Sequence, residues 1–80
     1  MDINVARHAI RACFRSGREL EDLLGLLRKH CNDSEYKTYA SAIATAIASI
    51  HLEVVDRLTS SHPGLGDEVD AIISKYDRYL

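Results

Sequence analysis

The segment from Ser34 to Ser60, SEYKTYASAIATAIASIHLEVVDRLTS, contains no Pro or Gly and decides the fold. Ala occupies every second position from Ala40 to Ala48. This alternation also fits a strand, but Ala is a poor strand former and the best helix former. The larger residues recur at helical steps of three and four, at Tyr36, Ala40, Ile43, Ile47, Ile50, Val54 and Leu58. The segment therefore predicts one long helix over residues 34–61.

Both ends of this helix carry sequence signals. Asn32 or Asp33 can cap its start, and Asn32 has capping-box spacing to Glu35. Pro63-Gly64 stops it near residue 61. Its weakly polar arc spans about 200°, twice the usual amphipathic stripe. We expect a second copy to cover the surplus, through a self-association face made of Ala44, Ala48, His51, Leu52 and Val55.

The N-terminal third shows a seven-residue repeat. One set of positions is Ile3, Ile10, Gly17, Leu24 and Cys31, and the other is Ala6, Cys13, Leu20 and Leu27. Such a repeat predicts a helix over residues 3–31 that packs antiparallel against the long helix, with its Leu residues buried. Ser16 and Glu19 have capping-box spacing, so the helix either continues, kinks or splits at Gly17. The unbroken repeat favours a continuous or mildly kinked helix, with Gly17 allowing another backbone to approach closely.

The C-terminal segment predicts a shorter helix over residues 66–79. Its apolar residues are helically spaced, at Leu65, Val69, Ile72, Ile73, Tyr76 and Leu80. Acidic residues lie near the expected start of this helix, where they interact favourably with the positive end of the helix dipole. The predicted fold class is therefore all-α, a small antiparallel bundle of two long helices and one shorter one, forming a single domain over residues 1–80.

Composition limits the functional classes. A chain of 80 residues buries only a modest core, and small scaffolds often compensate by forming oligomers. The net charge of −2 is ordinary for a soluble protein. Cys13 and Cys31 would lie about 27 Å apart on a continuous helix, too far to form a disulfide, so we expect a cytoplasmic protein with reduced thiols. The longest uninterrupted apolar run is far shorter than the ~20 residues of a membrane span. We therefore expect no membrane span. His30 and Cys31 are adjacent, and His51 and His62 are eleven residues apart, so neither pair can share a metal ion, and we expect no metal and no cofactor.

Charge is distributed unevenly along the chain. Arg7, Arg11, Arg15 and Arg18 recur every three or four residues and form an arginine ridge on the first helix, whereas residues 53–80 are net acidic. The ridge has three interpretations: it binds phosphate of a nucleic acid, it meets an acidic protein surface of this or another chain, or it is solvated. Aromatic residues do not alternate regularly with these Arg, since Phe14 alone lies among them, so nucleic acid is not the favoured partner.

Signals of catalysis are few. Neither Cys13 nor Cys31 has a His at a spacing that local structure would bring to it. Arg57 and His62 fit an R-x4-H pattern, which resembles the catalytic signature of HEPN ribonucleases, a family of helical bundles. That family typically has Asn, Asp or His after the Arg, whereas this chain has Leu58. The resemblance implies a ribonuclease using Arg57 and His62, a remote alternative.

The sequence thus predicts a protein that is not an enzyme. We expect a small helical protein–protein interaction module, of the kind found among small bacterial adaptors, antitoxins and immunity proteins. Its expected partners are a second copy, forming a homodimer, and an unidentified protein. A nucleic-acid-associated regulator that uses the arginine ridge is the first alternative.

Overall fold

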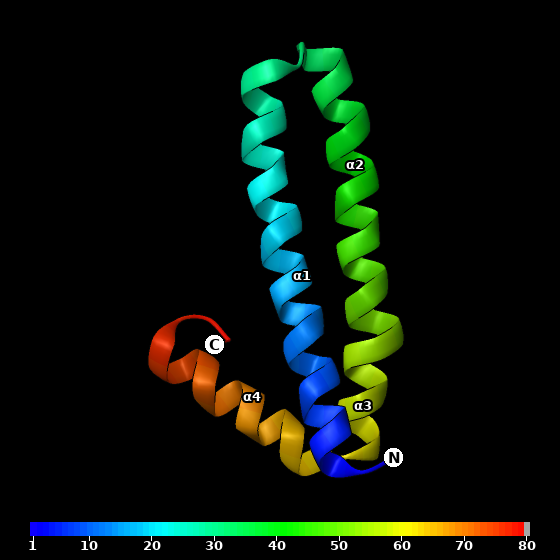
Figure 1. Ribbon diagram of the computed structural model, residues 1–80, viewed down its shortest axis with the longest axis vertical. Helices are drawn as coiled ribbons and strands as arrows, with labels where there is room; N and C mark the ends of the chain where they lie inside the picture. The colour runs from blue at the N-terminus through cyan, green and yellow to red at the C-terminus, as the bar shows by residue number, and fades with distance from the viewer. Residues whose placement is uncertain (80) are drawn as a thin grey trace.

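The computed structural model describes residues 1–79, which form helices joined by short connections. In chain order these are α1 (Ile3–His30), α2 (Asp33–Ile50), a π-helical turn η1 (His51–Val55), α3 (Asp56–Ser61) and α4 (Pro63–Tyr76). No strand occurs in the described residues, so the all-α prediction is confirmed. Figure 1 shows α1 and α2 side by side in opposite directions, with α4 packed at the end of the hairpin that carries the N-terminus.

Helix α1 is continuous through Gly17. The carboxylate of Asp2 caps its start by accepting a hydrogen bond of 3.1 Å from the Asn4 backbone N–H. At its other end the Cys31 N–H donates to the Leu27 carbonyl at 2.9 Å. A Cβ added at Gly17 would meet nothing within 4 Å. The expected close backbone approach at Gly17 is therefore wrong.

Helix α2 begins with the predicted capping box. The Glu35 N–H donates to Asn32 Oδ1 at 2.8 Å, and the Asn32 N–H donates to Glu35 Oε1 at 3.0 Å. The helix does not remain regular to residue 61, because η1 introduces a π turn. A π turn holds more than the 3.6 residues of an α-helical turn. Residues spaced four apart are therefore separated by a smaller angle around the helix axis than in a regular α-helix. His51, Val55 and Thr59 are thereby kept on one side of the helix.

Helix α4 begins and ends three residues earlier than predicted. Pro63 fits its first turn because that turn leaves backbone N–H groups unpaired and Pro has none. Asp77 takes the left-handed conformation, with φ 61°, and ends the helix. The acidic residues therefore do not lie in the first turn, as the sequence suggested, and Tyr79 belongs to a tail that turns back toward α1.

The hydrophobic core lies at one end of the molecule. Its buried cluster consists of Ala6, Ile10, Leu65, Val69 and Tyr79, with Phe14, Leu58 and Ile72 packed against it. We call residues 1–16 and 51–79 the three-helix end, and residues 17–50 the arm. The arm holds no buried residue. The Leu20, Leu24 and Leu27 side chains are only half-buried, which corrects the expectation of full burial, because only one helix covers them.

Candidate functional site

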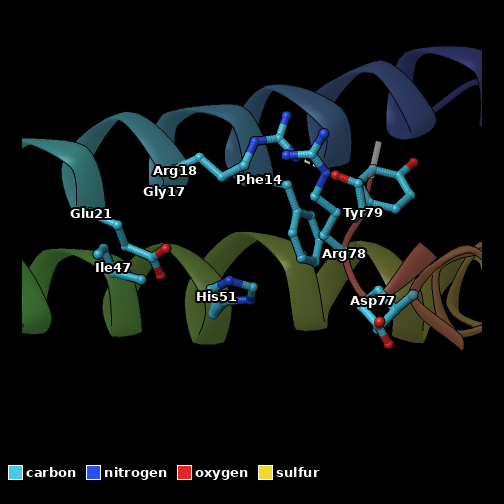
Figure 2. Close-up of a pocket in the computed structure, with 10 residues that line it drawn as sticks. Phe14, Gly17, Arg18, Glu21, Ile47, His51, Asp77, Arg78 and Tyr79 are labelled. Atoms are coloured by element: carbon cyan, nitrogen blue, oxygen red, sulfur yellow. Dashed lines mark hydrogen bonds between the residues drawn. The ribbon is translucent and has the colours of Figure 1, made fainter.

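Phe14 joins the hairpin to the C-terminal tail. Its ring meets His51 edge-on, with centroids 5.0 Å apart and planes at 89°, and lies 4.8 Å from the Tyr79 ring. Tyr79 is only 3% exposed, although it lies beyond the last helix. Arg18 donates a hydrogen bond from Nη1 to the Tyr79 carbonyl oxygen, which holds the tail against α1 (Figure 2). No spacing pattern in the sequence indicated Phe14 and Tyr79 as packing residues of the core.

A shallow cleft of about 240 Å3 borders this aromatic contact. Phe14, Ile47 and His51 form part of its apolar lining, and Figure 2 shows these side chains between α1 and α2. Its charged lining has both signs, with Arg18 and Arg78 beside Glu21 and Asp77. This mixed lining favours neither an anionic nor a cationic ligand.

The arginine ridge is divided by α4. Arg7 Nε donates to Glu68 at 3.0 and 3.3 Å, and Arg7 Nη1 donates to Asn4 Oδ1 at 2.8 Å. Arg18 is held by the tail, as described above. Arg11 and Arg15 remain exposed. The four residues therefore do not act as one surface: half of the ridge binds the C-terminal segment of its own chain, one of the three predicted interpretations.

The predicted self-association face is not a continuous surface. Ala44, Ala48 and Leu52 are exposed, but His51 packs on Phe14 and Val55 is only 5% exposed. Including them in a free face was wrong, because Phe14 of α1 packs against the His51 ring and the Val55 side chain is buried.

A different apolar surface follows the opposite flank of the hairpin. Helix α4 and its tail contact α1 through Arg7, Phe14 and Arg18, and helical spacing places another set of residues on the flank turned away from them. This set, which we call the back stripe, is Val5, Ala12, Leu23 and Leu26 of α1 with Tyr39, Ala42 and Ala46 of α2, all of them exposed. Leu23, Leu26 and Tyr39 are 37%, 55% and 50% exposed, and they are the large exposed hydrophobic residues of the arm.

The side chains considered for chemistry do not form a reactive site. No group of three or more His, Cys, Asp or Glu in residues 1–79 could hold a metal ion. Burial raises the pKa of the Cys13 thiol, which disfavours the reactive thiolate. Arg57 Nη2 binds Glu53 Oε2 at 2.7 Å on an exposed surface, and His62 lies at the junction of α3 and α4.

The continuous helical segment from Asp33 to Ser61 has a property that the sequence analysis did not anticipate. By length and composition alone it is apolar enough to cross a membrane, and little of it is buried. Ser and Thr interrupt its apolar run without adding charge, and the Thr45 hydroxyl donates to the Ser41 carbonyl at 2.9 Å within the helix. The expectation that the apolar run is too short was based only on uninterrupted apolar residues.

Comparisons with family models, with curated proteins and with solved structures found no match to this chain.

Proposed function

We propose that this protein is a small, non-catalytic helical interaction module of the adaptor, antitoxin or immunity type, and that it self-associates through its arm. In this proposal two hairpins complete an antiparallel bundle that neither forms alone. The observation that supports it most strongly is the absence of any buried residue in the arm. Helices of this length and apolar content are normally stabilised by burying one face against other elements.

The energetic reason is the apolar surface that the isolated hairpin leaves in water. Transfer of such surface from water is favourable by about 25 cal/mol per Å2. Leu26 and Tyr39 keep half or more of their surface exposed, so a partner that covers them gains free energy that the isolated chain lacks. Contiguous exposed apolar surface of this kind is typical of protein interaction sites.

The nucleic-acid alternative has less support. Only Arg11 and Arg15 of the ridge are exposed, and the chain carries a net charge of −2. Binding through phosphates would weaken steeply as salt is raised. We expect no retention on heparin at low salt. Retention that is lost when Arg11 and Arg15 are both changed to Ala would favour the nucleic-acid function.

The ribonuclease alternative depends on Arg57 and His62. The Arg57 guanidinium is paired with Glu53, and neither Arg57 nor His62 lines the cleft beside Phe14. We expect no cleavage of single-stranded RNA. Cleavage that disappears in the His62→Ala variant would revive this alternative.

The self-association proposal is tested by sedimentation velocity between about 1 and 100 μM. We expect a monomer of 8.9 kDa at the lowest concentration and a dimer at the highest. A monomer over the whole range would overturn self-association. Flotation with liposomes made of neutral and anionic phospholipids tests whether the apolar helix from Asp33 to Ser61 binds lipid instead. We expect the protein to remain with the soluble fraction.

A further inference from the structure

We propose that two copies pair antiparallel through the part of the back stripe that lies in the arm, α1 against the partner's α1 and α2 against the partner's α2. Leu23 then packs on the partner's Leu26, and Glu19 faces the partner's His30. This inference rests on the proposed self-association and specifies its surface and register.

The first argument is the spacing of four exposed residues on α1. Glu19, Leu23, Leu26 and His30 are all exposed and lie within a band about 60° wide on the helical wheel. Their successive steps are four, three and four residues. Because this series reads the same in both directions, a copy turned by a two-fold axis places each Leu opposite a Leu and each Glu opposite a His. A two-fold interface requires such self-complementarity.

The polar residues at the ends of the band also match. His30 lies on the band and Lys29 beside it in the basic last turn of α1, whereas Arg28 lies over the Tyr36 ring of α2. In the antiparallel register the Glu19 carboxylate faces the His30 end of the partner helix, and the symmetry axis repeats the contact. Opposite charges at the rim of an interface select partner and register more than they add affinity.

The second argument comes from α2. Only Cys31 and Asn32 separate α1 from α2, so residues equally distant from this connection lie at the same height in the hairpin. Tyr39 is therefore level with Leu23 and Leu24, near the proposed axis. Ala42 and Ala46 beside it have small side chains, which allow the two α2 helices to approach closely.

The size of the contact predicts its strength. Overlap from residue 19 to residue 30 is about 18 Å long, at 1.5 Å per residue, and two helices are about 20 Å wide. This face is smaller than the ~800 Å2 per partner of a standard interface. We therefore expect a dissociation constant in the micromolar range.

A charge exchange tests the register. His30→Glu places two carboxylates opposite each other at both ends of the interface and should weaken dimerisation about 5- to 10-fold in sedimentation equilibrium. Adding Glu19→Lys restores opposite charges and should return the dissociation constant to within about threefold of the unmodified protein. A double variant as weak as His30→Glu alone would overturn the register.

A pair of matched variants tests the surface. Leu26→Glu would bury a carboxylate twice by symmetry and should weaken dimerisation at least ~100-fold. Leu52→Glu makes the same change at an exposed position outside the stripe and should have less than a twofold effect. Circular dichroism reports whether each variant remains folded. If the dimer resists Leu26→Glu but dissociates in Ala48→Glu, this surface is wrong and self-association stands. If the unmodified protein is a monomer, both the proposed surface and the proposed self-association are overturned.

Discussion

The two ends of this molecule contain similar residues but differ completely in burial. The arm has the larger share of Leu, yet none of its residues is buried, whereas the three-helix end buries Ala6, Ile10, Leu65, Val69 and Tyr79. The difference lies in the number of packing elements. Two helices cover one stripe of each other, and only a third element closes the groove between them. Burial here depends on architecture more than on hydrophobicity.

The largest expected effect tests this difference directly. Ile10→Ala should lower the free energy of unfolding by about 2–4 kcal/mol, since the side chain is 1% exposed and its removal leaves a cavity. Leu24→Ala in the arm should lower the free energy of unfolding by about half as much. A half-buried side chain removes less apolar surface from water, and neighbouring side chains can move into the space that it leaves. Urea denaturation at a concentration that keeps the protein monomeric measures both. Equal costs would mean that the arm is packed as well as the three-helix end.

The C-terminal tail provides the next test. Tyr79→Ala should cost about 2–3 kcal/mol, because it removes a buried ring from its contact with Phe14. Tyr76→Ala is the matched control, with a ring 49% exposed, and should cost less than ~1 kcal/mol. Thermal unfolding of both variants decides whether the tail contributes to the core. If Tyr79→Ala destabilised the protein less than Tyr76→Ala, the tail would not be part of the core of the three-helix end.

The ion pair between α1 and α4 should contribute modestly. Arg7 and Glu68 have side chains that are 29% and 38% exposed, so solvent screens their attraction. A double-mutant cycle using Arg7→Gln and Glu68→Gln should give a coupling of about 0.5–1 kcal/mol. The same cycle at Arg57 and Glu53, which are 75% and 61% exposed, should give about 0.3 kcal/mol. If the coupling energy of Arg57 and Glu53 exceeded that of Arg7 and Glu68, the Arg7–Glu68 ion pair would not stabilise the packing of α4 on α1.

The smallest expected effect is an increase in stability. Gly25 lies inside α1, is exposed, and would meet nothing within 4 Å if it carried a Cβ. Gly25→Ala should stabilise the arm by about 0.5–1 kcal/mol, because Ala loses less backbone entropy in a helix. Chemical denaturation checks the sign. Destabilisation would indicate that something packs against this position.

Local signals in the sequence predicted the helical class and the capping box at Asn32 well. The half-burial of Leu20 and Leu24 was not predictable in the same way, because a seven-residue repeat identifies a seam but not how many helices cover it. Phe14 was missed for a related reason. It lies beside the arginine ridge, outside the repeat, and becomes central only because Tyr79 folds back onto it.

The candidate surface was harder to predict than the fold. The wheel indicated an apolar surface on the long helix wider than one partner needs, and Ala44, Ala48 and Leu52 are exposed. It also grouped His51 and Val55 with Ala48, because the pattern of one helix does not show that Phe14 of another helix covers His51. No pattern in the sequence indicated the π turn, and the contact of His51 with Phe14 comes from a residue far away in the chain.

The π turn also sets the rotation between α2 and α3. Each residue of an α-helix turns the chain by about 100°, so the residue accommodated in η1 fixes how α3, and α4 after it, are rotated relative to α2. Deleting one residue between His51 and Val55 should leave α2 and α3 helical while rotating one against the other. Helix α1 runs unbroken through the arm and the three-helix end and cannot follow this rotation, so α3 and α4 would lose their packing against the core cluster. The assembly of the three-helix end is therefore encoded in part by five residues that lie outside that cluster.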